Sequence, residues 1–458
     1  MRVKNKNILI VGMGESGKSA CTFLKQKNAK IFLYDDKEEV RQKLKNQFPS
    51  CVVVDKVDGD FLQNIDLLVL SPGVSIYCEV CKLAMLIDVK IISELQLGLE
   101  FARGRTIAIT GTNGKTTTVN LIEQIFNYSK KRNVMVGNVG NPITSFVSRF
   151  RTNYICEVSS FQLESSEIKP NIACILNLSQ NHLDRHFSFK QYAETKFKIF
   201  KNMTRRDFLV LNYDDVNLKK LQSKQTEIFG EPLEIKPKIV WFSQKEKVNG
   251  AYVKNDEIWF NDGTSEFRVC SLKDIKLLGN HNVYNVLASV CVALLSKIKL
   301  KYIVQAIKSF SGVEHRIQYF STKNGVDYFN DSKSTTPDST KIAVKAMKKP
   351  IILILGGSDK GLNYDDLALY LKDKVKFTIL TGEISSNLER SFKKAFIKNY
   401  CVIKDFYEAS KYATKIASKG DCVLLSPATA SFDCFKNFEQ RGEVFMKIIN
   451  EGDFNFES

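Results

Sequence analysis

Short apolar segments alternate with longer mixed segments along most of the chain. They are rich in Ile, Val and Leu and lie at Asn7–Val11, Lys30–Tyr34, Asp66–Leu70, Thr106–Thr110, Tyr154–Val158, Ile172–Leu178, Phe208–Leu211, Ile351–Leu355, Phe377–Leu380 and Cys422–Leu425. Nearly continuous apolar segments of this kind are typical of parallel strands buried on both faces of a sheet. Several end at Gly, Ser, Asp or Asn. The pattern therefore predicts an α/β fold with ligand sites at the carboxyl ends of the strands.

The strands and the stretches between them fall into three sets, and we predict a domain for each. The sets cover residues 1–96, 97–312 and 313–458, and the middle one includes a more strand-rich stretch near Lys236–Val269. This length agrees with two or three domains of about 100–200 residues each. In the middle set, Val119, Ile122 and Phe126 recur at helical spacing and are predicted to share one face of a helix.

Composition and charge argue against nucleic-acid-binding, membrane-spanning and secreted classes of protein. The net charge is +17, but Lys and Arg are spread along the chain without an arginine-rich tract or a nucleic-acid-binding signature. We therefore expect no nucleic-acid partner, and the charge instead favours capture of polyanionic small molecules. No apolar run approaches the roughly 20 residues of a membrane span, and the first residues lead directly into a strand rather than a signal peptide. These features predict a cytoplasmic protein without a membrane partner.

The cysteines do not predict a disulfide framework or a zinc site. There are 11, and they are scattered along the chain. The pair Cys78-x-x-Cys81 has no second pair at zinc-site spacing, so a structural role is the favoured interpretation.

The first glycine-rich turn fits two motifs at once. Gly12-Met-Gly-Glu-Ser-Gly-Lys-Ser19 reads as G-x-G-x-x-G and also as the P-loop string G-x-x-x-x-G-K-S. In both motifs the glycines let the backbone approach a phosphate at a helix N-terminus. The next strand ends at Asp35, about 20 residues beyond the turn, where a Rossmann-like domain places a carboxylate beside a nucleotide. We therefore interpret this turn as a Rossmann-like diphosphate cradle in which Lys18 is incidental.

The second glycine-rich turn has the features of an ATP site, although its spacing does not match the strict P-loop motif. It reads Gly111-Thr-Asn-Gly114-Lys115-Thr116-Thr-Thr and lies between a strand and an amphipathic stretch. Lys115 can reach the β- and γ-phosphates, and the Thr116 hydroxyl can bind Mg²⁺. A later strand carries Glu157, an acid where a second metal contact is needed. This context favours the second turn as the ATP site.

These motifs, together with an ordered series of others, resemble the Mur ligase superfamily over nearly the whole chain. That superfamily also includes folylpolyglutamate synthetase. The further matching segments are Ser71-Pro-Gly73, Gly137-Asn-Val-Gly140, Glu157-Val-Ser-Ser-Phe-Gln-Leu-Glu164, Asn177-Leu-Ser-Gln-Asn-His182-Leu-Asp-Arg185, Tyr192-Ala-Glu-Thr-Lys196, Gly279-Asn-His-Asn-Val-Tyr-Asn285, Glu314-His-Arg316, Asp331-Ser-Lys-Ser-Thr335, Gly356-Gly-Ser-Asp-Lys-Gly361 and Ser426-Pro-Ala-Thr-Ala-Ser-Phe-Asp433.

Within this superfamily the chain is most similar to the branch that adds D-glutamate to UDP-N-acetylmuramoyl-L-alanine. The compact first domain, the Ser-Ser-Phe-Gln-Leu-Glu run and the segment after Ser426 select that branch. The resemblance implies an α/β fold with a Rossmann-like UDP-binding domain, a central P-loop-type ATPase domain with a mainly parallel sheet, and a C-terminal Rossmann-like domain that binds the amino acid. It also implies an acyl-phosphate intermediate, ATP and two Mg²⁺ ions, a role in bacterial peptidoglycan precursor synthesis, and small-molecule substrates bound by a monomer.

The resemblance assigns roles to individual residues. For catalysis it implies Lys115, Glu157, His182 and Lys196. For the metal ions it implies Thr116, Glu157, His182 and Lys196, the last as a carbamylated lysine. For ATP it implies Gly111, Thr112, Asn113, Gly114, Lys115, Thr116, Thr117, Asn282, Asn285, Arg316 and Asp331.

The same resemblance assigns the other two substrates. For the UDP-substrate it implies Gly14, Glu15, Ser16, Asp35, Ser71, Pro72, Gly73, Val74, Asn138, Ser159, Gln162 and His182. For D-glutamate it implies Lys333, Thr335, Lys360, Ser431 and Phe438. Phe432 is expected to pack against its neighbours.

Three alternatives remain open at this point. Folylpolyglutamate synthetase lacks a UDP-binding first domain, so the first turn and Asp35 argue against it. An NAD(P)-dependent oxidoreductase could use the first turn, but that function does not account for the second turn and its candidate metal-binding residues. A non-catalytic nucleic-acid-binding protein is suggested by charge alone.

Overall fold

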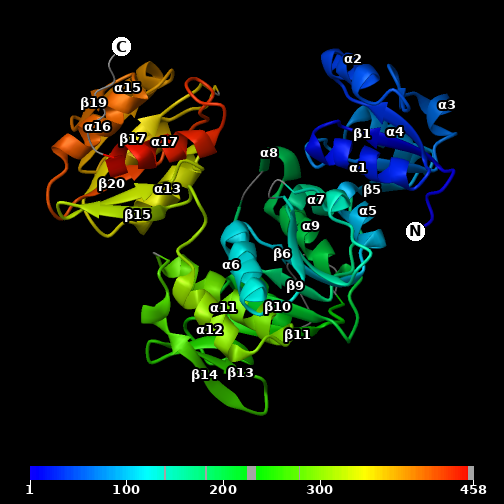
Figure 1. The fold of residues 1–458 in the computed structure, drawn as a ribbon, viewed down its shortest axis with the longest axis horizontal. Helices are drawn as coiled ribbons and strands as arrows, with labels where there is room; N and C mark the ends of the chain where they lie inside the picture. The colour runs from blue at the N-terminus through cyan, green and yellow to red at the C-terminus, as the bar shows by residue number, and fades with distance from the viewer. Residues whose placement is uncertain (139–140, 181–182, 224–233, 278, 360, 452–458) are drawn as a thin grey trace. The chain divides into compact units, whose positions relative to one another are not determined.

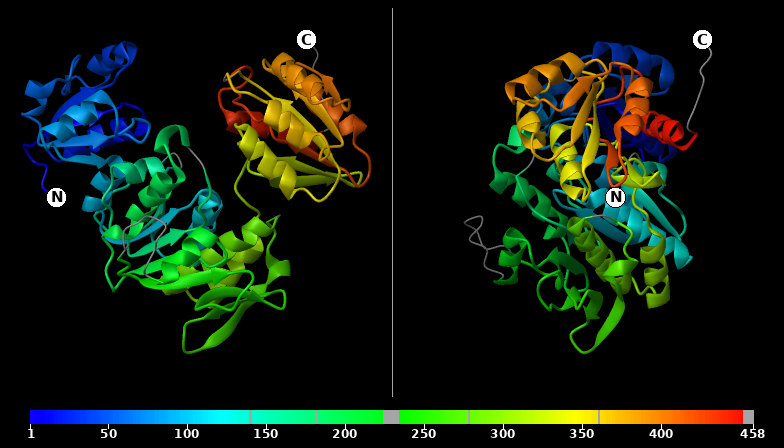
Figure 2. Two further views of the ribbon diagram at one scale, coloured as in Figure 1. Left: turned by 180° about the vertical axis from the view of Figure 1, so that it is seen from behind. Right: turned by 90° about the vertical axis from the view of Figure 1, so that its left-hand side faces the viewer.

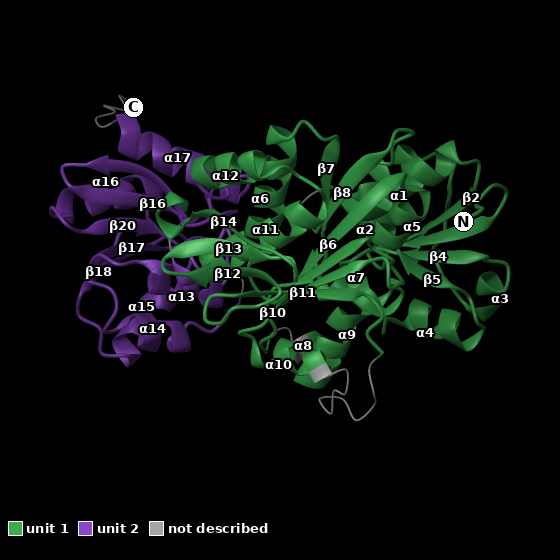
Figure 3. Cartoon of the chain, turned by 90° about the horizontal axis from the view of Figure 1, so that it is seen from below, with its two compact units in different colours: residues 1–275, 281–310 green, residues 276–280, 311–458 purple. Residues whose placement is uncertain are grey.

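A computed structural model describes the chain except for residues 139–140, 181–182, 224–233, 278, 360 and 452–458. The described chain forms two compact units (Figure 3). Unit 1 comprises residues 1–275 and 281–310, and unit 2 comprises residues 276–280 and 311–458. Unit 1 holds two β-sheets and unit 2 holds one. The predicted three-domain α/β fold class is confirmed. The boundaries at residues 96 and 312 remain predictions.

The N-terminal sheet is parallel and has the strand order β3-β2-β1-β4-β5. Figure 1 labels β1 and β5 among the helices of this part. Its strands are β1 (Asn7–Val11), β2 (Lys30–Tyr34), β3 (Val52–Val53), β4 (Leu67–Leu70) and β5 (Ile91–Ser93). Its helices are α1 (Glu15–Gln26), α2 (Glu38–Gln47), α3 (Gly59–Leu62), α4 (Glu79–Leu86) and α5 (Glu94–Phe101). The direction of winding reverses between β1 and β4, so the turns after these two strands flank one crevice.

The central sheet has nine described strands in the order β14-β13-β12-β11-β10-β9-β6-β8-β7. They are β6 (Gly104–Thr110), β7 (Asn133–Gly137), β8 (Thr152–Glu157), β9 (Ile172–Ile175), β10 (Phe208–Asn212), β11 (Lys238–Ser243), β12 (Gly250–Lys254), β13 (Glu257–Asn261) and β14 (Glu266–Ser271). Strand β11 and the antiparallel β12–β14 edge occupy the stretch near Lys236–Val269 that was predicted to be rich in strands. The β12–β14 edge lies at the lower end of the unit in Figures 1 and 2.

The helices of this part surround the parallel strands. They are α6 (Lys115–Tyr128), η1 (Ile143–Ser145), α7 (Ser160–Glu164), α8 (Leu183–His186), α9 (Phe189–Lys201), α10 (Val216–Lys219), η2 (Lys220–Ser223), η4 (Leu272–Asp274), α11 (Asn280–Leu295) and α12 (Leu300–Ser309). Val119, Ile122 and Phe126 are fully buried on α6, which confirms the predicted helix face. None of the described helices is long and apolar enough to cross a bilayer.

The sheet of unit 2 has the order β15-β16-β20-β17-β18-β19, parallel except at the β15–β16 pair. Its strands are β15 (Gln318–Lys323), β16 (Val326–Asn330), β17 (Ile351–Gly356), β18 (Phe377–Thr381), β19 (Tyr400–Val402) and β20 (Cys422–Leu425), and its helices are α13 (Pro337–Ala346), α14 (Asp365–Leu371), α15 (Ser385–Lys394), α16 (Phe406–Ile416) and α17 (Phe438–Glu451). Because β16, β20 and β17 are parallel neighbours, the segments that follow them meet at one edge of the sheet.

Candidate active site

The first glycine-rich turn is closely packed against the turn after β4. Gly12 has φ +86°, and a Cβ atom there would lie 2.4 Å from Cγ2 of Val74. A Cβ atom on Gly17 would lie 2.1 Å from the Gly12 carbonyl oxygen. Only glycine fits at either position, since a methyl group on Gly12 would push against the turn after β4 and one on Gly17 would clash with the backbone of the first turn itself. The turn leads directly into the N-terminus of α1, where backbone N–H groups favour an anion.

Two hydrogen bonds fix this turn. The Ser71 hydroxyl donates to the Gly12 carbonyl oxygen over 2.6 Å, and the Met13 N–H donates to Oδ2 of Asp35 over 2.8 Å. Asp35 therefore holds the turn in addition to facing the site predicted for the UDP-substrate. The loops after β1, β2 and β4 are tied into one arrangement.

These loops line a cavity of about 510 Å³ together with residues of the central domain. The cavity brings together most of the residues predicted for the UDP-substrate: Gly14, Glu15, Ser16, Asp35, Ser71, Pro72, Gly73, Val74, Asn138 and Gln162. Ser159 does not line it, and His182 lies outside the described residues. Residues that are distant in the sequence thus meet at the crevice that the strand order predicts.

Ser159 and Gln162 form a capping box at the start of α7. The Gln162 N–H donates to the Ser159 hydroxyl over 3.2 Å, and the Ser159 N–H donates to Oε1 of Gln162 over 3.0 Å. The two residues satisfy backbone donors that a helix start otherwise leaves unpaired. Both side chains therefore have a structural role that was not predicted, although the Ser-x-x-Gln spacing carries its signature.

Arg185 links the central domain to the turn after β4. Its guanidinium donates to both carboxylate oxygens of Glu164, the shortest contact being 2.7 Å, and also reaches the carbonyl oxygens of Pro72 at 3.5 Å and Val74 at 3.2 Å. It also lies 4.0 Å from the ring centre of Phe161. Arg185 therefore positions the loop that lines the 510 Å³ cavity, a role that was not predicted.

The second glycine-rich turn joins β6 to α6 and requires glycine at two positions. Gly111 and Gly114 have φ +146° and +86°. The Lys115 ammonium donates to the carbonyl oxygens of Gly111 and Thr112 over 2.8 and 2.9 Å, so this lysine lies over the turn. Thr116 is buried in the first turn of α6. A lysine above a glycine turn at a helix N-terminus is the arrangement that binds a triphosphate.

Neighbouring elements hold this turn in place. A Cβ atom on Gly114 would lie 2.3 Å from Oδ1 of Asn285, and the Asn285 amide donates to Oδ1 of Asn282 over 2.9 Å. Thr112 accepts a hydrogen bond from the Tyr192 hydroxyl over 3.1 Å. The two asparagines that were predicted to contact ATP thus lie against the turn, on the first part of α11.

Lys196 and Glu157 are both buried beside the second turn. Lys196 is 1 % exposed, and its ammonium lies 3.3 Å from the hydroxyl oxygen of Thr110. Burial, and next the positive charge of Lys115, hold the pKa of Lys196 well below its ordinary value, while the charge of Glu157 acts in the opposite direction. A buried lysine of this kind favours its neutral amine.

Glu157 ends β8 and has one unpartnered carboxylate oxygen. Its Oε1 accepts a hydrogen bond from the Asn138 amide over 3.0 Å, whereas its Oε2 is buried without a hydrogen-bond partner. A buried carboxylate oxygen without a partner is unfavourable unless a cation binds it. The Glu157 carboxylate and the Thr116 hydroxyl are hard oxygen donors, the kind of ligand that Mg²⁺ prefers. Across the described residues there is no cluster of three or more His, Cys, Asp or Glu that could hold a metal.

The segment after β16 in unit 2 carries predicted ATP and D-glutamate residues. Asp331 is buried and accepts hydrogen bonds from the Ile317 N–H over 3.0 Å and the Ser426 hydroxyl over 2.7 Å. Burial raises the pKa of Asp331 to about 6. Arg316 is exposed, so its guanidinium is accessible to a phosphate, whereas Asp331 mainly ties β16 to β20.

The predicted D-glutamate residues follow neighbouring strands. Lys333 and Thr335 follow β16, and Ser431, which is buried, follows β20. The Lys333 ammonium lies 5.2 Å from the ring centre of Phe438 at the start of α17. Lys360 lies outside the described residues. Phe432 is 73 % exposed, so the expectation that it packs was wrong; its side chain points out of the loop that carries Ser431.

Arg441 on α17 is a further positioning residue that was not predicted. It is 1 % exposed and donates to the Ser332 hydroxyl and to the carbonyl oxygens of Ser332, Thr429 and Ala430 over 2.9–3.1 Å. Burial lowers the pKa of Arg441 to about 10. These bonds join the loop of Lys333 to the loop of Ser431. Four of the five N–H donors of the guanidinium therefore have acceptors, and hydrogen bonds of this kind offset the cost of burying its charge.

Comparisons with known proteins agree with this geometry. Family models match the MurD-like N-terminal domain of Mur ligases over residues 6–93, the Mur ligase middle domain over residues 109–293 and the Mur ligase glutamate ligase domain over residues 315–429. The chain belongs to the Mur ligase family. One relative within this family, the UDP-N-acetylmuramoylalanine--D-glutamate ligase of Lachnospira eligens, is 39 % identical over 98 % of this chain and 100 % of its own. The ligase of the same name from Clostridioides difficile is 37 % identical over 98 % of this chain and 99 % of its own.

Solved Mur ligases share the fold. The UDP-N-acetylmuramate-alanine ligase MurC of Thermotoga maritima matches with a TM-score of 0.57 at 19 % identity, covering 98 % of this chain and 100 % of its own. The MurF ligase of the same organism, solved in complex with ADP, matches with a TM-score of 0.57 at 15 % identity, covering 98 % and 96 % of the two chains. Mur ligases are ATP-dependent enzymes.

Proposed function

We propose that this chain joins D-glutamate to UDP-N-acetylmuramoyl-L-alanine at the expense of ATP. The observation that carries the proposal is the 510 Å³ cavity in which ten residues predicted for the UDP-substrate come together. The full-length similarity to D-glutamate ligases supports the same substrate pair. The reaction belongs to peptidoglycan precursor synthesis in the bacterial cytoplasm, and the enzyme acts as a monomer on small molecules, without nucleic acid or membrane.

The chemistry has two steps. The L-alanyl carboxylate attacks the γ-phosphorus of ATP, which forms an acyl phosphate and releases ADP. The amine of D-glutamate then attacks the acyl carbon, the amide bond forms and inorganic phosphate leaves. Both steps bring anions together, so the main task of the protein is to neutralise charge and position the reactants.

The residues divide this task between them. Lys115 binds the β- and γ-phosphates, and the N–H groups of the second turn hold the phosphate chain. Asn282, Asn285, Arg316 and Asp331 bind or position the adenosine and phosphate groups. Lys333, Thr335, Lys360, Ser431 and the backbone near Phe438 bind the two carboxylates of D-glutamate. Charge-assisted hydrogen bonds of this kind are roughly twice as strong as neutral ones.

Two Mg²⁺ ions belong to this proposal. Thr116, Glu157, His182 and Lys196 would hold them, with Lys196 carrying a carbamate, and the unpartnered Glu157 oxygen fits such a ligand set. When bound, the ions supply positive charge to the phosphate and carboxylate oxygens. Lys196 suits carbamylation because its lowered pKa favours the neutral amine that reacts with CO₂.

The proposal is tested by mass spectrometry of the product. The purified chain is incubated with ATP, Mg²⁺, UDP-N-acetylmuramoyl-L-alanine and an amino acid, either D-glutamate, L-glutamate or meso-diaminopimelate. The expected product gains one glutamyl residue with D-glutamate and forms far more slowly with the other two. Product formation with meso-diaminopimelate, or turnover of a folate in place of the UDP-substrate, would assign the chain to another branch of the family.

A further inference from the structure

A third region of unit 1 holds a cavity that shares no residue with the UDP-substrate cavity or the ATP turn. It has a volume of about 900 Å³. Its walls come from α1, from the end of α5 and the residues before β6, and from the segment around η1. The lining residues are Ser19, Thr22, Phe23, Gln26, Lys27, Phe101, Arg103, Thr144, Ser145, Val147, Ser148 and Arg149.

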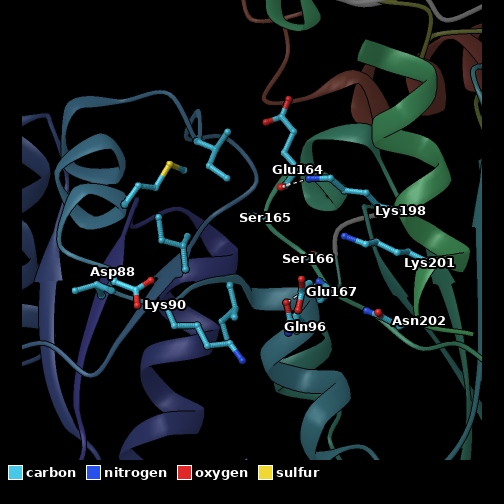
Figure 4. Close-up of a pocket in the computed structure, with 15 residues that line it drawn as sticks. Asp88, Lys90, Gln96, Glu164, Ser165, Ser166, Glu167, Lys198, Lys201 and Asn202 are labelled. Atoms are coloured by element: carbon cyan, nitrogen blue, oxygen red, sulfur yellow. Dashed lines mark hydrogen bonds between the residues drawn. The ribbon is translucent and has the colours of Figure 1, made fainter. Parts of the chain in front are cut away.

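Every ionisable residue that lines this cavity is a cation. Lys27, Arg103 and Arg149 line it, no Asp or Glu does, and five of the other lining residues carry hydroxyl groups. A cavity of about 400 Å³ elsewhere in unit 1 provides a contrast (Figure 4). Three lysines and three acids line that second cavity, namely Lys90, Lys198, Lys201, Asp88, Glu164 and Glu167. The one-sided charge of the larger cavity is therefore not a general property of the surface.

The cations of the larger cavity are not neutralised from within the protein. Within the described part of the chain, neither Arg103 nor Arg149 has a side-chain hydrogen bond or an ion pair, and the Lys27 ammonium lies over the rings of Phe23 and Phe101 at 5.2 and 5.5 Å. Like charges that converge on a cavity repel one another, and a bound anion relieves that repulsion. Guanidinium groups match a phosphate with paired N–H donors.

The walls of the cavity are joined by side-chain hydrogen bonds. The Ser19 hydroxyl on α1 lies 2.6 Å from the hydroxyl oxygen of Thr144 and 2.6 Å from that of Ser145. Thr144 in turn donates its N–H and its hydroxyl to Oε1 of Glu94 over 2.8 and 2.6 Å, and Glu94 is 1 % exposed. The parts that come from the N-terminal and central domains are thus held in one arrangement, so the cavity is formed before any ligand binds.

We propose that this cavity binds a phosphorylated small molecule with a hydroxyl-bearing body, such as a sugar phosphate. Arg103 and Arg149 hold the phosphate, while the serine and threonine hydroxyls and the edge of the aromatic pair contact the rest. The volume exceeds that of inorganic phosphate several-fold, so a larger ligand fills the site. This site is separate from the proposed substrate sites and does not depend on the proposed reaction.

The test measures binding of ribose 5-phosphate, inorganic pyrophosphate and unphosphorylated ribose by isothermal titration calorimetry. The proteins are the wild type, the double variant Arg103→Gln/Arg149→Gln, the variant Arg151→Gln and the variant Lys115→Ala. Arg151 is exposed and lies near Arg149 in the chain without lining the cavity, so it is the matched control. Thermal unfolding of each variant verifies that the fold is intact.

The double variant is expected to weaken ribose 5-phosphate binding at least ~10-fold, a loss of about 1.4 kcal/mol, whereas Arg151→Gln and Lys115→Ala leave it unchanged. Tighter binding of ribose 5-phosphate than of pyrophosphate identifies a sugar phosphate, and the reverse order identifies a free polyphosphate. Equal affinity in the wild type and the double variant, loss of binding in Lys115→Ala alone, or equally strong binding of ribose would each overturn the proposal.

Discussion

The ammonium of Lys196 lies 3.3 Å from the hydroxyl oxygen of Thr110, the last residue of β6, and is buried beneath the turn that carries Lys115. A charged lysine at this depth is unfavourable, and its pKa is lowered accordingly, first by burial and then by Lys115. In the proposed reaction the neutral amine of Lys196 would react with CO₂, and the carbamate would replace a cation by an anionic oxygen ligand for the metal that Glu157, with its unpartnered Oε2, would also hold.

The first prediction concerns that modification. Lys196→Ala loses most of its activity, because the site loses an anionic ligand, and short carboxylates such as acetate restore part of it by occupying the vacated position. The measurement is phosphate release with and without acetate. Lys198→Ala, a change on the same helix, is the control, since its ammonium bonds instead to the carbonyl oxygen of Glu164. Full activity of Lys196→Ala without added acid contradicts the assignment.

The two glycine-rich turns differ in their expected response to loss of their lysines. Lys115→Ala lowers ATP-dependent phosphate release by about 10²-fold or more, as loss of a preorganised donor does. Lys18→Ala leaves it nearly unchanged, because the first turn is a Rossmann-like cradle in which the Lys18 side chain is incidental. Steady-state kinetics of ATP-dependent phosphate release by both variants shows which of the two turns binds ATP. If Lys18→Ala is the inactive variant, the two assignments are reversed.

Glu94 gives unit 1 a pH-dependent stability. Burial raises its folded-state pKa from 4.5 to about 7, so between these values the folded state binds more protons than the unfolded state. The contribution of protonated Glu94 to the free energy of unfolding is complete below about pH 4.5 and is lost as the pH rises through 7. The pKa shift corresponds to about 3 kcal/mol.

Glu94→Gln tests this because the amide oxygen can still accept from Thr144 without a charge. The midpoint of thermal unfolding of the variant, relative to the wild type, is expected to rise as the pH goes from 5 to 8. A difference between the two proteins that is constant across this range contradicts the assignment.

Arg441 is expected to control D-glutamate binding through the loops that it joins. Arg441→Met removes a donor from the carbonyl oxygens of Ser332, Thr429 and Ala430, of which Ala430 still accepts from the Ser358 N–H, and destabilises unit 2 by about 3 kcal/mol. The KM for D-glutamate rises while the KM for the UDP-substrate stays near the wild-type value. Lys447→Met, at an exposed lysine of the same helix, is the control. An equal rise in both KM values would point to a general loss of folded protein instead.

The sequence predicted the large parallel strands and the residues that gather at their ends. Gly12 and Asp35 could be related because a Rossmann-like domain places a carboxylate about 20 residues after its glycine turn, whereas Ser71 was assigned by the family resemblance. The short strands β3, β5 and β19 could not be predicted, since two or three residues carry too little periodicity.

Positioning residues were the main part of the site that sequence reasoning missed. Arg185 and Arg441 act through carbonyl oxygens of distant loops, and no local pattern encodes such contacts. Ser159 and Gln162 carried a readable capping-box spacing, but their similarity to substrate residues dominated the interpretation. The family resemblance assigned Asp331 to ATP binding. Its buried hydrogen bonds to Ile317 and Ser426 could not be predicted, because they depend on the three-dimensional structure.

The central claim is that the chain activates the L-alanyl carboxylate of its UDP-substrate through an acyl phosphate. The most direct test labels that carboxylate with heavy oxygen and measures the mass of the phosphate released when D-glutamate and ATP are supplied. The account predicts that one labelled oxygen passes from the carboxylate to each phosphate, with one amide bond formed per ATP consumed. Phosphate that carries oxygen from the solvent instead, released without amide formation, would contradict it.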